Sequence, residues 1–223
     1  MGSVLGVFGG TFDPVHCGHL NLARELRATL NLSAVRFVPA GDPPHRAAPA
    51  TTAGHRLAMV ELAVAGEPGL EVDAREVRDA RRSYTVPTLE ELRREEPSRA
   101  LALIVGADTF VGLPTWHRWR EIFALAHVVV VRRPGVALEA ALAGELAREW
   151  TRRHTRDPAA LARQEAGAVI LQPTTAHLIS ASAIREQLGR GAAGIDAVRG
   201  LLPAAVLAYI ERNQLYRPRP DAT

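Results

Sequence analysis

The chain has no lysine, so all 27 of its basic residues are arginines. This absence excludes two kinds of site, because a P-loop requires the pattern GxxxxGK[ST] and Schiff-base chemistry requires an amine side chain. Any phosphate bound by the protein must therefore be held by backbone N–H groups, histidine, arginine or a metal ion. Cys17 is the only cysteine, which excludes a disulfide framework and a cysteine zinc cluster.

Long apolar runs are also missing. The chain begins MGSVLGVF, without the basic region and long apolar stretch of a signal peptide, and its apolar run at 128–131 is far too short to span a bilayer. We therefore expect a cytoplasmic protein without a membrane partner. The pI of 9.7 is typical of nucleic-acid-binding proteins. However, 24 acidic residues are interleaved with the arginines, and no basic run alternates with aromatics, so we expect no nucleic-acid partner.

The apolar pattern predicts strands that alternate with helices. With 223 residues, 47% of them hydrophobic, the chain can bury a full core. Short apolar runs predict strands at 4–8, 35–39, 101–105, 127–131 and 168–171, and a half-exposed strand at 70–74. Apolar residues at helical spacing or cap signals predict helices up to residue 30, from 52, from 85, and at 138–154, 158–165, 180–188 and 203–213.

This order of elements predicts an α/β fold. We expect one domain over 1–223, built on a doubly wound, mainly parallel, Rossmann-like sheet, with a small helical part at about 180–216. Ligands of such sheets bind at the carboxyl ends of the strands. The segments that follow the predicted strands are therefore where a site is expected.

The first predicted strand leads into a glycine turn and two histidines. Gly9 and Gly10 allow unusual φ angles and close approach of a ligand, although the GxGxxG pattern of dehydrogenases is absent. His16 and His19, three residues apart at a helix start, project to one side, where free N–H groups attract anions. Because the helix dipole disfavours imidazolium, we expect neutral N–H donors aimed at a phosphate. Capping the helix, packing against Phe12, or ligating a metal without a nearby third ligand remain alternatives.

Two further polar positions follow predicted strands. Residues 180–188 predict a helix that Ser180 or Ser182 can cap, with Arg185 in its first turn. An arginine there opposes the helix dipole, which makes sense if an anion lies between them. Asp108 follows the strand at 101–106, where an aspartate either caps a helix or contacts a ligand.

Several segments resemble one enzyme family. GGTFDPVHCGH resembles the signature of the nucleotidyltransferase superfamily with the HxGH motif, here at 16–19, and ISASAIR at 179–185 is similar to its second motif, ISxxxIR. Within that superfamily the chain most closely resembles the bacterial nicotinate-nucleotide adenylyltransferases. The supporting segments, in family order over nearly the whole chain, are PAGDPPHR, RRSYTVPTL, GADTF, LPTWHRW, RRPG and YIERNQLY.

The resemblance implies adenylyl transfer from ATP to nicotinate mononucleotide, giving deamido-NAD and pyrophosphate, a step in NAD biosynthesis. The acceptor phosphate attacks the α-phosphorus without a covalent enzyme intermediate. Mg²⁺ comes with ATP, held mainly by phosphates and water rather than by side chains. The implied ATP-binding residues are Gly9, Gly10, Thr11, Phe12, His16, His19, Gly106, Asp108, Ile179, Ser180, Ser182 and Arg185. The implied catalytic residues are His19, His16 and Arg185, with Arg185 on the leaving pyrophosphate.

The same resemblance implies a site for the acceptor. Trp116 offers a face for the pyridine ring, and Thr85 and the backbone near His117 can receive the nicotinate carboxylate. A tryptophan that only packs is the alternative. Arg46 and Arg133 are the implied phosphate contacts, although the family commonly has lysine where Arg46 stands. The arginine-rich segment 138–165 carries no family motif and is expected to be a solvated helical face.

Other functions stay open at this stage. The acceptor could be nicotinamide mononucleotide or phosphopantetheine, although Trp116 and the SYT stretch favour a pyridine ring. A non-catalytic nucleotide-binding domain is the second alternative, but such domains usually lose the histidines that this chain keeps. The sequence does not give the oligomeric state, and a homo-oligomer is one option.

Overall fold

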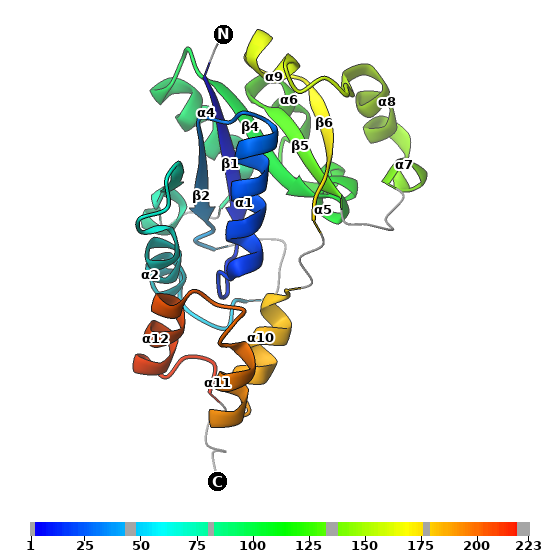
Figure 1. Ribbon diagram of the computed structural model, residues 1–223. Coiled ribbons are helices and arrows are strands. Elements are labelled where there is room, and N and C mark those ends of the chain that lie inside the picture. Colours follow the sequence, from blue (N-terminus) through cyan, green and yellow to red (C-terminus); the bar gives the residue numbers. More distant parts are fainter. Residues whose placement is uncertain (1–2, 43–47, 80–82, 133–137, 176–178, 218–223) are drawn as a thin grey trace.

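The computed structural model describes residues 3–42, 48–79, 83–132, 138–175 and 179–217. A six-stranded sheet with the order β3-β2-β1-β4-β5-β6 forms its centre, and all neighbouring strands are parallel (Figure 1). The strands are β1 (Val4–Gly10), β2 (Ala34–Pro39), β3 (Leu70–Val72), β4 (Ala100–Gly106), β5 (His127–Arg132) and β6 (Val169–Pro173). The predicted doubly wound α/β fold is confirmed.

Helices cover both faces of this sheet. The longer ones are α1 (Cys17–Thr29), α2 (Ala53–Val64), α4 (Thr85–Glu95), α8 (Gly144–Arg153), α10 (Ala181–Leu188), α11 (Ala192–Val198) and α12 (Ala204–Arg212). The shorter ones are α3 (Arg75–Arg78), α5 (Ala107–Val111), α6 (Ile122–Leu125), α7 (Leu138–Ala141) and α9 (Ala160–Arg163), with 3-10 turns η1 (Leu113–Thr115) and η2 (Trp119–Glu121).

The core consists of two apolar layers, one on each face of the sheet. In β4, Ala102 and Ile104 belong to the layer that contains α1 and α2, whereas Leu101 and Leu103 belong to the layer that contains α4 and α6. Side chains of a strand alternate between faces, so a strand buried on both sides must be apolar throughout. This is why the uninterrupted apolar runs of the sequence became the central strands.

Several predicted boundaries change. Thr52 caps α2 as predicted, its hydroxyl accepting the His55 N–H at 3.4 Å. The predicted strand at 70–74 ends at Val72. The predicted helix at 138–154 is divided into α7 and α8, with Gly144 at φ +57°, and the one at 158–165 shortens to α9. The sequence analysis missed α3, α5, α6 and α11, each of which has seven residues or fewer.

The three C-terminal helices α10, α11 and α12 lie beyond the carboxyl ends of β1 and β2 (Figure 1). Their buried residues Ile184, Val206 and Ile210 join the same apolar layer as α1 and α2. The predicted helical part is therefore attached to the sheet at the end where ligands bind. Among the described helices, none combines the length and the apolar character needed to cross a membrane.

Candidate active site

A cavity of about 780 Å³ lies at the carboxyl ends of β1 and β4, where the strand order reverses. Such a switch point is the usual binding place in an open α/β sheet. The predicted site residues that line it are Gly9, Gly10, Thr11, Phe12, His19, Thr85, Gly106, Trp116, His117, Ser182 and Arg185. His16, Asp108, Ile179 and Ser180 are described but do not line it. Arg46 and Arg133 lie outside the described residues.

Gly10 of this turn is needed because it has no side chain, and not because of an unusual φ angle. Gly9 and Gly10 end β1 without a φ in the left-handed region, so the freedom of φ that glycine allows is not used there. At Gly10 a Cβ atom would lie 2.9 Å from the ring of Phe12. The ring can therefore lie where it does only because residue 10 has no side chain. The residue with the positive φ, 50°, is Phe12 itself. Its buried ring lies against His19, with 5.1 Å between the ring centroids.

The two histidines stack on each other at the start of α1. Their ring centroids are 3.7 Å apart and their planes differ by 19°, so the predicted projection to one side is confirmed. His16 is the N-cap residue and is only 5% exposed, whereas His19 lines the cavity. Gly18 makes this stacking possible, because a Cβ there would lie 3.0 Å from Nδ1 of His16. His16 therefore supports the ring that faces the cavity, and its implied contact with phosphate stays a prediction.

The protonation of His19 follows from its hydrogen bond. The backbone N–H of His16 donates to Nδ1 of His19 at 3.2 Å. A ring nitrogen that accepts a hydrogen bond carries no proton, so the neutral ring carries its proton on Nε2. Burial, and secondarily the neighbouring His16, holds the pKa of His19 well below its ordinary value. His19 is thus a neutral N–H donor as expected, although burial rather than the helix dipole is the main cause.

Arg185 connects α10 to the loop that follows β1. It lies in the last turn of α10, not in the first as predicted, because the helix begins at Ala181. Its guanidinium donates to the carbonyl oxygen of Asp13 at 2.7 Å and to the hydroxyl of Ser182 at 3.3 Å. Ser180 occupies the predicted N-cap position, but its side chain makes no cap hydrogen bond. Arg185 keeps a place in the cavity wall while it holds the loop.

Sequence reasoning did not single out Asp13, a buried carboxylate in the wall of the cavity. It is 5% exposed and accepts hydrogen bonds from the Ala50 N–H at 2.7 Å, the Thr51 hydroxyl at 2.8 Å and the Tyr216 hydroxyl at 2.7 Å. These donors come from two segments far from Asp13 in the sequence. Its position inside the quoted GGTFDP segment was the one signal available.

Arg56 is a second missed residue. Its side chain, 1% exposed, donates to the carbonyl oxygens of Thr11 at 2.8 Å, Ala40 at 2.5 Å and Gly41 at 2.8 Å. Burial lowers the pKa of its guanidinium, and the Asp13 carboxylate opposes this effect. Arg56 therefore fixes the loops after β1 and β2 relative to each other. Its place four residues before Val60, on the apolar face of α2, was the signal that could have marked it as buried.

Gly106 and Asp108 occupy the turn from β4 to α5. Gly106 is the N-cap residue of α5 and lines the cavity. Asp108 is exposed in the first turn of α5, where its negative charge interacts favourably with the positive end of the helix dipole. Asp108 is therefore not the N-cap residue of α5, and its implied contact with ATP stays a prediction.

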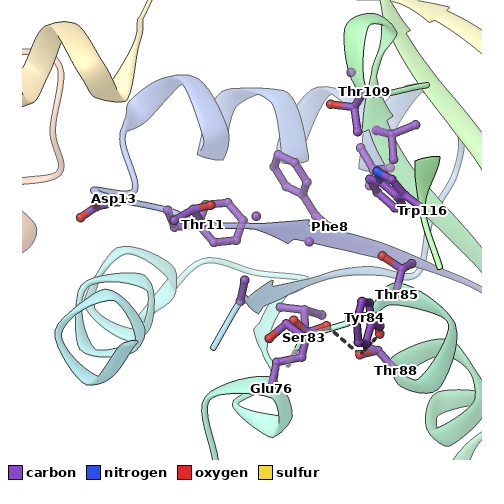
Figure 2. Close-up of a pocket in the computed structure, with 18 of the residues that line it drawn as sticks. Phe8, Thr11, Asp13, Glu76, Ser83, Tyr84, Thr85, Thr88, Thr109 and Trp116 are labelled. Atoms are coloured by element: carbon purple, nitrogen blue, oxygen red, sulfur yellow. Dashed lines mark hydrogen bonds between the residues drawn. The ribbon is translucent and has the colours of Figure 1, made fainter. Parts of the chain in front are cut away.

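The opposite end of the cavity is built from α4 and from the residues after η1. In Figure 2, Thr85 and Trp116 lie at one end and Thr11 and Asp13 at the other. Thr85 is the first residue of α4, and the N-cap residue Tyr84 provides no side-chain cap. Trp116 packs partly against the apolar layer of α4 while it lines the cavity, so it combines packing with an available face.

Glu76 forms part of this end and was not predicted. Its carboxyl accepts the Thr88 hydroxyl at 2.6 Å, as Figure 2 shows, and it also interacts with Ser83. The Ser83 oxygen accepts the Gly41 N–H at 2.8 Å. Burial raises the pKa of Glu76, and the hydrogen bonds from Thr88 and Ser83 act in the opposite direction. Glu76 thereby ties the start of α4 to the loop after β2.

The comparisons with known proteins agree with this geometry. The cytidylyltransferase-like family model matches residues 7–187. A curated protein of Dechloromonas aromatica, named "Probable nicotinate-nucleotide adenylyltransferase", is 51% identical over 97% of this chain and 99% of its own length. One of the same name from Stenotrophomonas maltophilia is 48% identical over 96% and 97%. The chain belongs to the nicotinate-nucleotide adenylyltransferase family. The predicted resemblance is confirmed.

A solved structure shows the same fold at low sequence identity. The nicotinic acid mononucleotide adenylyltransferase of Plasmodium falciparum, complexed with NaAD, matches with a TM-score of 0.71 at 13% identity, over 96% of this chain and 97% of that chain. At this identity the match shows the arrangement of the chain and not the identity of its site residues.

Proposed function

We propose that the protein transfers the adenylyl group of ATP to nicotinate mononucleotide, producing deamido-NAD and pyrophosphate in NAD biosynthesis. The observation that carries this proposal is one cavity with N–H donors suited to phosphate, those of His19 and Arg185, at one end and Thr85 with Trp116 at the other. The names of the curated relatives support it. The Plasmodium falciparum enzyme was solved with NaAD and with APC in two separate structures, which also supports a nucleotide site in this fold.

In this proposal the triphosphate of ATP lies at the end that contains Asp13. The Nε2–H of His19 donates to an oxygen of the α-phosphate, where negative charge grows during in-line attack by the acceptor phosphate. A neutral donor suits this task because its strength does not depend on a proton being gained near neutral pH. Arg185 binds the β- and γ-phosphates that leave as pyrophosphate. The backbone of Gly9, Gly10 and Thr11 lies close enough to the cavity to contact the nucleotide.

The acceptor occupies the other end. Its pyridine ring stacks on Trp116, and its carboxylate lies at the N-terminus of α4, near Thr85, where N–H groups and the helix dipole favour an anion. His117, whose ring lies 4.9 Å from that of Tyr84 between centroids, completes this end. Contacts of Arg46 and Arg133 with phosphate stay predictions.

We propose that Mg²⁺ enters with ATP. Within the described residues, no group of three or more His, Cys, Asp or Glu side chains is placed to hold a metal ion, and the Asp13 carboxylate already accepts three protein donors. These features fit a metal ion bound by phosphate oxygens and water. When bound there, the ion would neutralise charge on the triphosphate.

Product analysis tests the proposal. The protein is incubated with ATP, Mg²⁺ and, in separate reactions, nicotinate mononucleotide, nicotinamide mononucleotide or phosphopantetheine. We expect nicotinate mononucleotide to react about tenfold faster than the others or better, because a site built for a carboxylate leaves N–H groups unpaired with other ligands. Equal or reversed rates would refute the choice of acceptor. Absence of product in every reaction would favour a non-catalytic nucleotide-binding domain.

A further inference from the structure

Tyr216, near the end of the described chain, reaches back to the phosphate end of the cavity. It lies four residues beyond the end of α12, and its hydroxyl donates to the Asp13 carboxylate at 2.7 Å. Both Gln214 and Tyr216 have positive φ, 53° and 62°, a conformation that side-chain-bearing residues rarely adopt. The chain after α12 is thus bent against its backbone preference, and the bend turns the tyrosine inward onto Asp13.

Asp13 is the point where the C-terminal helical part meets the loop after β1. Its carboxylate accepts from Tyr216 and, on the side of α2, from Ala50 and Thr51. Its carbonyl oxygen accepts a hydrogen bond from Arg185. One residue therefore holds the guanidinium through its backbone while its own charge is satisfied by neutral donors. Burial beside this carboxylate raises the pKa of Tyr216 far above its usual range, so the phenol stays a donor.

We propose that Tyr216 is a positioning residue for ATP binding. Its hydroxyl donates a hydrogen bond to the Asp13 carboxylate, so this carboxylate does not pair with Arg185, and the Arg185 guanidinium can bind the phosphates of ATP. A buried carboxylate that loses a hydrogen-bond donor is destabilised, so pairing with another donor or cation becomes more favourable. Two guanidinium groups lie near this carboxylate: Arg56 is held by three carbonyl oxygens, whereas Arg185 is already bonded to the backbone of Asp13 itself and is the one that can turn to it. Capture of the guanidinium by that carboxylate would withdraw it from ATP. This inference rests on the proposed function of the site.

The chain provides a matched control in Tyr209. The Tyr209 hydroxyl bonds to Nδ1 of His55 at 2.9 Å, between α12 and α2, and neither residue lines the cavity. Tyr209→Phe and Tyr216→Phe each remove one hydroxyl that connects the C-terminal part to the rest of the protein, and the Tyr216 hydroxyl also interacts with Thr51. They differ in whether the bond reaches Asp13.

The experiment measures ATP binding by calorimetry without acceptor, together with steady-state kinetics and thermal unfolding, for the wild type and both variants. We expect Tyr216→Phe to weaken ATP binding and to lower kcat/KM for ATP by about tenfold, the loss of one hydrogen bond to a charged group. The KM for nicotinate mononucleotide should change by less than about twofold, because that end of the cavity is untouched. Tyr209→Phe should bind ATP like the wild type while losing a similar amount of thermal stability.

A rescue experiment tests the mechanism. Adding Asp13→Asn to Tyr216→Phe removes the charge that would capture Arg185, so the double variant should recover part of the lost ATP affinity. Thr51→Val, which removes another donor to Asp13, should weaken ATP binding in the same direction and serves as a second variant if Tyr216→Phe does not fold.

The outcomes separate the two proposals. ATP binding by Tyr216→Phe within about twofold of the wild type, or an equal loss in Tyr209→Phe, would overturn the positioning role. Failure of the wild type to make product from any acceptor would overturn the proposed function, while the binding measurements would still decide the role of Tyr216. A wild type that does not bind ATP would overturn both.

Discussion

Replacing Arg56 by methionine should destabilise the protein strongly. The substitution keeps an unbranched side chain but leaves the carbonyl oxygens of Thr11, Ala40 and Gly41 without their donor. Each buried acceptor left unpaired costs about 1–3 kcal/mol. Two effects reduce the sum: these three residues are partly exposed, so water can replace some bonds, and the cost of burying the guanidinium disappears. We expect a net loss of about 2–4 kcal/mol.

Thermal unfolding followed by calorimetry or circular dichroism measures this loss. For a chain of this size, about 1 kcal/mol corresponds to 2–4 °C in Tm, so Arg56→Met should lower Tm by about 4–16 °C. Arg24→Met is the control, because Arg24 pairs with Glu67 while its own side chain is 47% exposed, and such pairs contribute about 0–1 kcal/mol. A Tm of Arg56→Met no lower than that of Arg24→Met would refute the assignment of Arg56 as the residue that holds both loops.

Three further predictions concern packing, pH and the acceptor end. Gly10→Ala should lower the free energy of unfolding by about 1–3 kcal/mol, because the added Cβ would lie 2.9 Å from the Phe12 ring. Gly9→Ala should lower it far less, because no atom lies within 4 Å of a Cβ there. Equal losses in the two variants would contradict this. Burial lowers the pKa of His127 below 6.5, so the unfolded chain binds a proton at a higher pH than the folded protein, and stability should fall as the pH drops below 6.5. His127→Gln should reduce this fall. A dependence of Tm on pH that is the same in both proteins would contradict the role of His127. Thr88→Val removes a donor to Glu76 and should raise the KM of the acceptor by about three- to tenfold without changing that of ATP, as initial rates would show.

The sheet was predictable because its strands are buried on both faces. Runs such as those of β4 and β5 contain apolar residues without a break, and the loops between strands contain turn residues and helix caps. Short helices were not predictable, because a single turn such as α3 shows no apolar period and forms where its neighbours allow it. The single-domain organisation and the cytoplasmic location stay predictions.

The site was predictable where its residues belong to local motifs. His19, Gly10 and Thr85 line the cavity, as the quoted segments implied. Asp13 and Tyr216 form their hydrogen bond across 203 positions of the sequence, and no local pattern encodes such a pair. The same limit applies to His16 and His19. Their spacing predicts that the two side chains lie together, but it does not predict which one is buried and which one lines the cavity.

The two ends of the described chain lie on opposite sides of the protein. Ser3 enters β1 at the amino edge of the sheet, far from the C-terminal helices, whereas Tyr216 bonds to the wall of the cavity (Figure 1). A purification tag joined ahead of Ser3 would emerge on the far side of the molecule. One joined behind Tyr216 would begin beside Asp13 and the cavity, and would strain the hydrogen bond between the two residues. Affinity handles and surface attachment therefore belong at the front of this chain.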